Sequence, residues 1–559
     1  MKTKGTIFKR KINNKEYYYH KYLENGKQVN KIMSDNEAYS LSFKLNFEGD
    51  YDEFINHKFN LEVSFGENLY RLSKVYKEFN KRYCYSQIEQ FIQASPVGKV
   101  LILYGLRRTG KTTLMFQTIN DLSFNNFCKA VYIKCDEGKT VYQLLDDLSY
   151  LSKNGFYYFF IDEITLLEDF ITLSSTISDI YGLKGKIVLS GTDSLGFSIA
   201  SHHELYDRNI MIHTTYISFK EFAEVLGIRS IDRYIEFGGT MSIEGVDYNK
   251  VINKGSYISN EYVDSAIIHN IIHSLESVKD GKLFFSLFDL YEKKELENVI
   301  ARLIEDTNHK FAISVIEREF KSRDYGSLKQ LLSLPNNYAK FGNVLSGVDE
   351  KQLTNDLMSA LNILNKEKQT HKIDENVLKE IEYFLSELDV LAFVDEISYP
   401  TFSTYKRPIF TQPGLRYSQA KTLVELLMND RHLKKYDITI LKAIKEKLLS
   451  DVKGRMIEDI IIYETSINIS QVFKMYFANK GEYDMVVLND EELVSYVYEI
   501  KHASTFNRDQ TKHLINKELK TIFEKKFYPI ESSNVLYKGE NIQVDDITYI
   551  NIEDYLLKN

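Results

Sequence analysis

Eight consecutive residues carry the types and the spacing that a phosphate-binding loop requires. Residues 105–112 read Gly-Leu-Arg-Arg-Thr-Gly-Lys-Thr, which fits the pattern G-x-x-x-x-G-K-[ST]. An apolar run at 99–104 favours a buried strand before the loop, and 113–119 can continue as a helix. The glycines let backbone N–H groups point at a phosphate chain, Lys111 reaches the outer phosphates and the Thr112 hydroxyl ligates Mg²⁺. The sequence therefore predicts a nucleoside triphosphate site.

A second acidic position for the metal lies about fifty residues further on. The aromatic and aliphatic run 156–161 predicts a buried strand that ends in Asp162 and Glu163. Asp162 is expected to hold Mg²⁺ together with Thr112, and Glu163 to polarise the attacking water. Another apolar strand at 186–189 ends in small polar residues, where Thr192 is the predicted sensor of the γ-phosphate. The residues predicted to contact the nucleotide are Gly105, Leu106, Arg107, Arg108, Thr109, Gly110, Lys111, Thr112, Thr113 and Thr192.

These motifs together resemble a family of prokaryotic AAA+-type P-loop ATPases. They are the loop, the Ile-Asp-Glu at 161–163 and the Leu-Ser-Gly-Thr at 189–192, followed by Ile-Ser-Phe-Lys-Glu-Phe at 217–222. The resemblance implies ATP and Mg²⁺ as cofactors, ATP hydrolysis, a doubly wound parallel sheet and a homo-oligomer formed through the ATPase domain. It also implies an arginine that stabilises charge developing on the γ-phosphate, which Arg208 matches by position. A surface salt bridge is the alternative for Arg208.

Four residues near the C-terminus have the types found at metal-dependent phosphodiester sites. Asp484 begins one predicted strand, a polar turn follows, and Glu499 and Lys501 end the next strand on the same face. Two carboxylates that hold Mg²⁺ beside a lysine can activate water against a phosphodiester. The arrangement resembles the PD-(D/E)XK nuclease fold, in which Glu458, on a predicted helix at 454–464, matches an additional acidic position. The resemblance implies catalytic roles for all four residues, Mg²⁺ or Mn²⁺ on Asp484 and Glu499, and DNA as the substrate; a nuclease-like fold retained as an inert platform is the alternative.

The N-terminal segment is strongly basic in a chain whose net charge is −8. Residues 1–31 hold nine basic and two acidic side chains, a net charge of +7. The pattern predicts strands at 6–12, 16–23 and 28–33, followed by a helix capped by Asp35. This segment resembles the three-stranded arm domains of tyrosine-recombinase integrases, which implies contact with DNA. A solvated sheet used for packing is the alternative.

The rest of the sequence predicts how the chain is divided into domains, and it adds no further catalytic residues. The predicted segments are a basic β arm (1–47), a helical linker (48–94), an ATPase core (95–225), a helical lid and winged-helix region (226–400) and a PD-(D/E)XK nuclease-like domain (401–559). Residues 388–395 resemble the wing of a winged helix. No run of 18 apolar residues predicts a membrane span, and Cys84, Cys128 and Cys135 have no metal-ligand spacing, so we expect a cytoplasmic protein.

Together these features predict an α/β multidomain protein whose ATP state controls a metal-dependent DNA nuclease. A role in defence against foreign DNA or in mobile-element biology fits that architecture. Two other readings stay open. One is an ATP-dependent switch or partner-binding regulator with an inactive nuclease-like domain, and the other is a DNA-remodelling motor.

Overall fold

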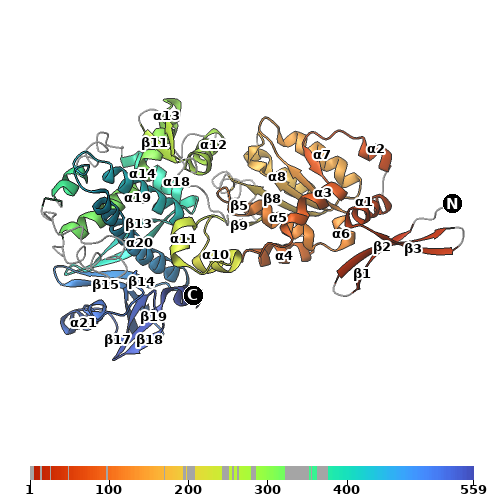
Figure 1. Ribbon diagram of the computed structural model, residues 1–559. Coiled ribbons are helices and arrows are strands. Elements are labelled where there is room, and N and C mark those ends of the chain that lie inside the picture. Colours follow the sequence, from red (N-terminus) through yellow and green to blue (C-terminus); the bar gives the residue numbers. More distant parts are fainter. Residues whose placement is uncertain are drawn as a thin grey trace. The chain divides into compact units, whose positions relative to one another are not determined.

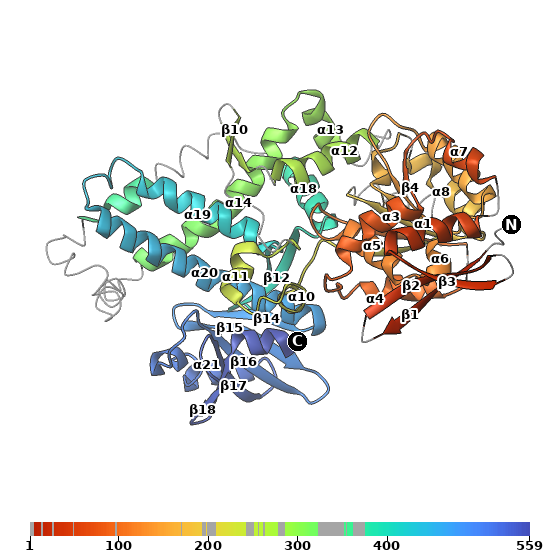
Figure 2. The same cartoon turned by 45° about the vertical axis from the view of Figure 1, so that its right-hand side comes forward.

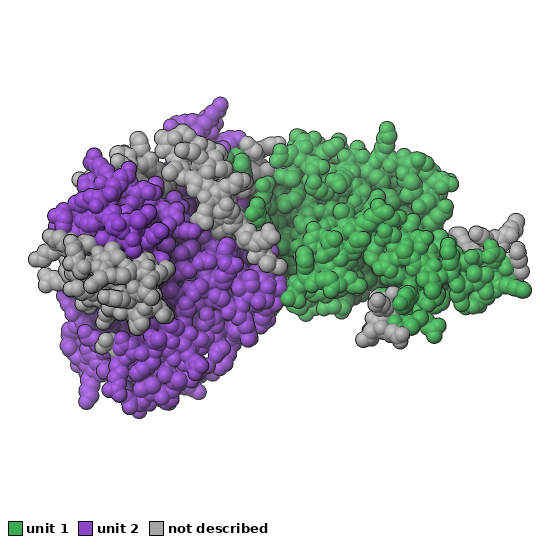
Figure 3. All heavy atoms as spheres, viewed as in Figure 1, with its two compact units in different colours: residues 1–215, 269–283 green, residues 216–268, 284–559 purple. Residues whose placement is uncertain are grey.

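The described chain folds as two compact units, which Figure 3 colours separately. The first unit comprises Met1–Thr215 and His269–Leu283, and the second comprises Tyr216–Ile268 and Phe284–Asn559. The computed structural model describes residues 5–12, 15–24, 27–47, 50–95, 98–168, 170–192, 197, 208–241, 251–254, 257–260, 263–277, 285–321, 352–353, 355–361 and 375–558. Within these residues no helix is both long enough and apolar enough to cross a membrane.

A sheet that includes β5, β8 and β9 lies at the centre of the first unit (Figure 1). It has six strands in the order β4-β6-β7-β8-β5-β9. Its strands are β4 (Glu62–Ser64), β5 (Val100–Tyr104), β6 (Ala130–Lys134), β7 (Tyr158–Asp162), β8 (Lys186–Gly191) and β9 (Asn209–His213). All neighbouring pairs are parallel except β4 with β6. The predicted parallel sheet of the ATPase core is therefore confirmed, and β4 brings part of the predicted linker 48–94 into the same sheet.

Helices cover both faces of this sheet, which explains the continuous apolar run of β5. Val100 and Ile102 pack with helices α7 and α8 on one face, while Leu101 and Leu103 pack with α3, α4 and α5 on the other. The helices of the first unit are α1 (Asp35–Asn46), α2 (Tyr51–Ile55), α3 (Gly66–Ser73), α4 (Tyr85–Gln93), α5 (Lys111–Asp121), α6 (Phe124–Phe127), α7 (Val141–Lys153), α8 (Phe170–Tyr181) and α12 (His269–Ser277).

The N-terminal segment forms the predicted antiparallel sheet of β1 (Thr6–Ile12), β2 (Lys15–Glu24) and β3 (Lys27–Met33). Helix α1 follows, but its N-cap is Ser34 rather than the predicted Asp35. The Ser34 side chain accepts a hydrogen bond from the Glu37 backbone N–H, and the Glu37 carboxylate accepts one from the Ser34 backbone. This reciprocal capping box satisfies two end groups of the helix, so it outcompetes a cap one residue later.

An eight-stranded mixed sheet forms the centre of the second unit, in the order β13-β12-β14-β15-β16-β17-β19-β18. The strands are β12 (Leu391–Tyr399), β13 (Ser403–Phe410), β14 (Val472–Phe477), β15 (Gly481–Asn489), β16 (Val494–Ile500), β17 (Ile530–Tyr537), β18 (Ile542–Val544) and β19 (Ile547–Asn551). The residues predicted as a wing, 388–395, lead into β12. This strand pairs antiparallel with β13 and parallel with β14, so it belongs to this sheet.

Long helices cover one face of the mixed sheet, and α19 and α20 lie side by side in both views (Figures 1 and 2). On the other face α21 packs through Leu519 and Phe523. The helices of the second unit are α10 (Phe219–Leu226), α11 (Ile231–Phe237), α13 (Phe285–Glu292), α14 (Leu296–Lys321), α18 (Glu375–Glu387), α19 (Pro413–Met428), α20 (Ile438–Asn468), α21 (Lys517–Glu524) and α22 (Ile552–Lys558). The described part of this unit also has a two-stranded sheet of β10 (Val251–Lys254) and β11 (Tyr257–Asn260).

Candidate functional sites

The predicted phosphate loop joins the carboxyl end of β5 to the first turn of α5. Gly105 has φ +136° and Gly110, the N-cap of α5, has φ +92°, so both occupy backbone conformations that favour glycine. A Cβ on Gly105 would lie 2.7 Å from Thr215 Oγ1 and 2.8 Å from Thr214 Oγ1. Position 105 therefore requires glycine for two independent reasons, its dihedral angle and the close approach of these hydroxyls.

Lys111 lies inside the loop with its ammonium group on backbone carbonyls. Lys111 Nζ donates to the carbonyl oxygens of Gly105 at 2.9 Å and Leu106 at 2.8 Å, and the side chain is buried. Burial lowers the pKa of Lys111 to about 8, although Glu163 and Asp162 oppose that change. An arriving phosphate would offer this ammonium a negatively charged acceptor in place of two neutral carbonyls.

Asp162, at the end of β7, is the hub of the polar contacts beside the loop. Its Oδ2 accepts hydrogen bonds from Thr112 Oγ1 at 2.8 Å and from the Tyr132 hydroxyl at 2.7 Å. Its Oδ1 accepts one from the Ser190 hydroxyl. The hydroxyl and carboxylate predicted to share Mg²⁺ are thus in direct contact, and their hard oxygen atoms suit that ion. Tyr132 and Ser190 were not predicted.

Glu163 follows Asp162 in a left-handed backbone conformation, with φ +55°. Its backbone N–H donates to Ser190 Oγ at 3.2 Å, and its Oε2 accepts a weak hydrogen bond from Thr192 Oγ1 at 3.5 Å. The Asn270 side chain donates to the Thr192 carbonyl. Burial raises the pKa of Glu163, in the direction a general base requires. The structure therefore brings the predicted base and the predicted sensor together.

The three arginines predicted to act on the nucleotide are exposed side chains. Arg107 and Arg108 are exposed on the loop, while Thr113 is half-buried in α5. Arg208 precedes the amino end of β9, where Asn209 pairs with Val100 at the start of β5. The loop begins at the other end of β5, so the length of a strand separates Arg208 from it. Arg208 Nε instead lies 3.3 Å from Asp179 Oδ1, which is the surface pairing named above as its alternative.

Hydrogen bonds that the sequence did not predict hold the phosphate-binding loop against Arg82 and the residues that follow β9. The Arg82 guanidinium donates to the carbonyl oxygens of Thr109 at 2.8 Å and Thr214 at 2.6 Å. The Thr109 and Thr214 hydroxyls are 2.8 Å apart, and the Leu106 N–H donates to Thr215 Oγ1 at 3.0 Å. Leu106 and Thr109 are both buried, so they position the loop rather than face solvent.

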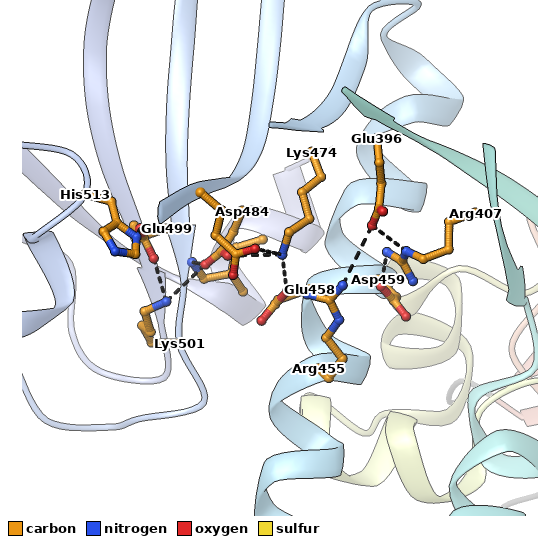
Figure 4. Close-up of polar contacts among 12 residues, drawn as sticks. Glu396, Arg407, Arg455, Glu458, Asp459, Lys474, Asp484, Glu499, Lys501 and His513 are labelled. Carbon is orange, nitrogen blue, oxygen red and sulfur yellow. Dashed lines mark hydrogen bonds and ion pairs between the residues drawn. The ribbon is translucent and has the colours of Figure 1, made fainter. Parts of the chain in front are cut away.

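The four residues predicted to form a metal-dependent phosphodiester site, Glu458, Asp484, Glu499 and Lys501, also lie close together (Figure 4). Lys501 Nζ lies 3.0 Å from Asp484 Oδ2 and 2.5 Å from Glu499 Oε2. Glu458 projects from α20 toward the same group. Asp484 and Glu499 are almost completely buried, so these contacts form away from water.

A further lysine, which was not predicted, lies at the centre of this group. Lys474 Nζ, on β14, lies 3.0 Å from Glu458 Oε2, 3.2 Å from Glu482 Oε2 and 3.4 Å from Asp484 Oδ1 (Figure 4). The Arg455 guanidinium also bonds Glu458 Oε2. We call Arg455, Glu458, Lys474, Glu482, Asp484, Glu499, Lys501 and His513 the carboxylate–lysine cluster.

The two central carboxyl groups of the carboxylate–lysine cluster respond oppositely to their surroundings. Burial raises the pKa of Asp484, but Lys501 and Lys474 outweigh it and hold this pKa well below its usual range. Burial and the Asp484 charge raise the pKa of Glu499 to about 7. His513 Nδ1 lies 3.1 Å from Glu499 Oε1, and this contact raises the histidine pKa. Glu499 therefore holds a proton more tightly than Asp484 does.

A divalent metal does not fit the carboxylate–lysine cluster as it is arranged. The oxygens of Asp484 already accept from two ammonium groups and the Ile500 N–H at 2.9 Å, and Glu458 Oε2 contacts two cations. Among the residues the structure describes, no group of three or more His, Cys, Asp or Glu side chains is placed to hold a metal ion. The arrangement is that of a closed ion-pair network.

A second buried ion-pair group lies on the same helix, one residue beyond Glu458. Asp459 Oδ2 accepts from Arg416 Nη1 at 2.7 Å, and its Oδ1 accepts from Arg407 Nη2 at 2.6 Å. Arg407 Nε also donates to Glu396 Oε1 at 2.6 Å. The positive neighbours hold the pKa of Asp459 well below its usual range despite burial. This group ties α19 and β13 to α20.

The comparisons with known proteins agree with the geometry of the first unit. Residues 97–223 match the family model of an AAA domain, so the chain contains an AAA-type P-loop ATPase domain. A relative, the uncharacterized protein MJ1544 of Methanocaldococcus jannaschii, is 26% identical over 266 residues, which cover 43% of this chain. The chain matches 57% of the length of that relative.

Two solved structures align over most of the chain at low similarity. The Walker-type ATPase PABY2304 of Pyrococcus abyssi covers 61% of this chain and 95% of its own, with 12% identity and a TM-score of 0.26. The Aeropyrum pernix ORC1 protein in complex with DNA covers 67% of this chain and 98% of its own, with 12% identity and a TM-score of 0.22. At these TM-scores neither alignment supports a functional argument.

Proposed function

We propose that this protein binds and hydrolyses ATP at the loop between β5 and α5. The observation that carries the proposal is the convergence of Thr112, Asp162 and Glu163 beside Lys111, within a domain that matches an AAA family. Thr112 Oγ1 and the Asp162 carboxylate are the groups that would hold Mg²⁺, which neutralises phosphate charge when bound. Lys111 binds the outer phosphates, and Glu163 accepts the proton of the attacking water.

Steady-state ATP hydrolysis by three variants tests this proposal. Lys111→Ala is expected to lose ATP binding, because it removes the buried ammonium of the loop. Glu163→Gln is expected to retain binding and to lose hydrolysis by about 10²-fold or more. Lys153→Ala, an exposed lysine in the last turn of α7, is the matched control and should leave both unchanged. Full hydrolysis by Glu163→Gln would contradict the assigned base.

The same proposal includes control of the second unit by nucleotide state, transmitted along the chain at 215–216. Thr214 and Thr215 hydrogen-bond the loop, and the next residue, Tyr216, belongs to the second unit. There the rings of Tyr216 and Tyr463 lie 5.2 Å apart, edge to face. We propose that phosphates entering the loop change its backbone, alter these threonine contacts and so move Tyr216.

The chain contains no tryptophan, which allows a clean optical test. Tyr463→Trp would place the only tryptophan against Tyr216, and ATP is expected to shift its emission. Adding Thr215→Val should remove that shift while ATP still binds, because it deletes the hydroxyl that accepts from the Leu106 N–H. Phe506→Trp is the control. The Phe506 ring contacts Tyr549 in the same unit, and the emission of a tryptophan there should not respond to ATP. Unchanged emission of Tyr463→Trp at saturating ATP would contradict the transmission.

Phosphodiester cleavage in the C-terminal sheet is the second candidate function. The meeting of Asp484, Glu499 and Lys501 favours it, whereas the ammonium of Lys474 among the carboxylates opposes it. Linear and circular DNA incubated with Mg²⁺ or Mn²⁺, with and without ATP, tests it beside Asp484→Ala. Cleavage that Asp484→Ala abolishes would establish the nuclease and support the predicted defence role. Its absence would favour the switch with an inert nuclease-like sheet.

The N-terminal sheet supports a proposed contact with DNA. Phe8, Tyr19 and Ile32 are directly opposed across β1, β2 and β3, so they form one row on one face. Strand alternation puts Arg10 and Lys21 on that face, and both are exposed. Aromatic rings can stack on bases, and the cations beside them can contact phosphates. Self-association through the ATPase domain stays a prediction, which sedimentation with and without ATP would measure.

A further inference from the structure

We infer that Lys474 is the resident cation of the carboxylate–lysine cluster and keeps divalent metal out of it. The resemblance to nucleases implies a metal on Asp484 and Glu499. In this chain each oxygen of Asp484 instead contacts an ammonium group, Oδ2 that of Lys501 and Oδ1 that of Lys474. This inference goes beyond the proposed ATPase function and does not depend on it.

The contacts of Lys474 are those of a bound cation rather than of a surface lysine. Its side chain is 4% exposed, and its Nζ lies within 3.4 Å of three carboxylates, Glu458, Glu482 and Asp484. An ammonium group has three protons to donate, so this set of acceptors can use all of them. The three acceptors come from α20 and β15, which Lys474 on β14 therefore joins.

An irregularity in the sheet aims these side chains at one another. Phe473 pairs with Val486, but Met475 pairs with Tyr483, so the register between β14 and β15 shifts across Lys474. Two residues of β15, Asp484 and Met485, consequently oppose the single residue Lys474. Such a bulge redirects side chains relative to the regular alternation of a strand. The ammonium and the Asp484 carboxylate meet at this point.

The charges of the carboxylate–lysine cluster balance without a metal ion. Four carboxylates, Glu458, Glu482, Asp484 and Glu499, face three permanent cations, Arg455, Lys474 and Lys501, and His513 contacts the fourth carboxylate. A divalent ion would meet both lysine ammonium groups at short range beside the buried Asp484 and Glu499, where like charges repel strongly. Removing the Lys474 charge would leave three carboxylates without that cation and so create the demand for another.

Electron paramagnetic resonance of free Mn²⁺ during titration of the nucleotide-free, full-length protein counts the bound ions. The wild-type protein and Asp484→Asn are expected to bind the same amount of Mn²⁺, because the carboxylate–lysine cluster of the wild-type protein holds none. Lys474→Met should gain one bound Mn²⁺ per chain, and the double variant Lys474→Met with Asp484→Asn should lose it again. Lys447→Met is the matched control, because Lys447 is also a mostly buried, ion-paired lysine on the same unit, and it should gain nothing.

Two results would overturn the inference. One is Mn²⁺ bound by the wild-type protein and lost in Asp484→Asn, which would show a native metal site despite Lys474. The other is a Lys474→Met protein that binds no additional Mn²⁺ while circular dichroism and its thermal transition show it folded. If Lys474→Met does not fold, Lys474→Gln, which keeps a polar side chain without the charge, takes its place with the same expected gain. ATP hydrolysis measured on the same samples reports on the other unit and separates this inference from the ATPase proposal.

Discussion

Glu464 makes the stability of the second unit depend on pH in a direction opposite to most carboxylates. It lies on α20 with its Oε1 accepting from the Phe219 N–H at 2.7 Å and the Tyr234 hydroxyl at 3.2 Å. Its side chain is buried with no cation among these partners, and burial raises its pKa from 4.5 to about 7. The folded protein therefore holds the Glu464 proton more tightly than the unfolded chain does.

The magnitude follows from the two pKa values. The protonated carboxyl makes its full contribution to stability below pH 4.5, and that contribution falls as the pH rises to 7. Between pH 5 and pH 8 the wild-type protein should lose about 2.5 kcal/mol of stability through this one group. Glu464→Gln has no proton to release, so it should not show this loss, and its carbonyl can still accept from Phe219.

The assay is urea denaturation at pH 5 and pH 8, followed through a tryptophan in the second unit. Phe506→Trp supplies it in both proteins, at a partly exposed ring in contact with Tyr549. We expect the stability of Glu464→Gln relative to its parent to rise by about 2–3 kcal/mol from pH 5 to pH 8. The control Glu425→Gln removes a half-exposed carboxylate paired with Lys445 and should show no such rise. Parallel behaviour of the parent and Glu464→Gln across this range would refute the reasoning.

Three further changes test other parts of the molecule. Asp459→Ala leaves the buried Arg416 guanidinium without its carboxylate and removes one of the two carboxylates that Arg407 contacts, so it should cost about 3–5 kcal/mol in the urea transition of the second unit; an unchanged midpoint would contradict this. Gly105→Ala places a methyl group 2.7 Å from Thr215 Oγ1 at φ +136°, so fluorescent-nucleotide titration should show lost ATP binding, and an unaltered Kd would count against the loop geometry. Arg10→Ala combined with Lys21→Ala should reduce the slope of log Kd against log salt for duplex DNA by about 2, whereas equal slopes would exclude these side chains from phosphate contact.

The nucleotide site could be predicted in outline because its main residues belong to a local motif. Lys111 and Thr112 follow β5 after the loop, and Asp162 ends β7, which β8 separates from β5. Because all three strands run parallel, their carboxyl ends lie at one edge of the sheet. The same logic places Thr192, which follows β8, at this edge, and its role as a sensor stays a prediction. Arg208 was misplaced relative to the loop, because no strand was predicted at 209–213 and Arg208 precedes the amino end of β9, whereas the loop follows the carboxyl end of β5.

The supporting residues of that site had no sequence signal. Arg82 precedes the loop by more than twenty residues and acts on carbonyl oxygens, which any residue type provides. Tyr132 bonds Asp162 from β6, but a tyrosine in an apolar strand reads as part of the core. Such partners are chosen by strand order and side-chain reach, and both are properties of the assembled sheet.

The carboxylate–lysine cluster shows most clearly where sequence reasoning stops. Asp484, Glu499 and Lys501 could be predicted to meet, because a hairpin and a two-residue alternation fix their relative positions. Lys474 lies only ten residues before Asp484, yet nothing in the run Val-Phe-Lys-Met-Tyr-Phe distinguishes a cation bound by three carboxylates from a lysine on a solvated edge. Lys474 is bound by three carboxylates because of the bulge in β15 opposite it and because α20 supplies Glu458. One lysine therefore decides whether the same acidic residues form a metal site or a closed ion-pair network, and its charge is the variable that the Mn²⁺ titration changes.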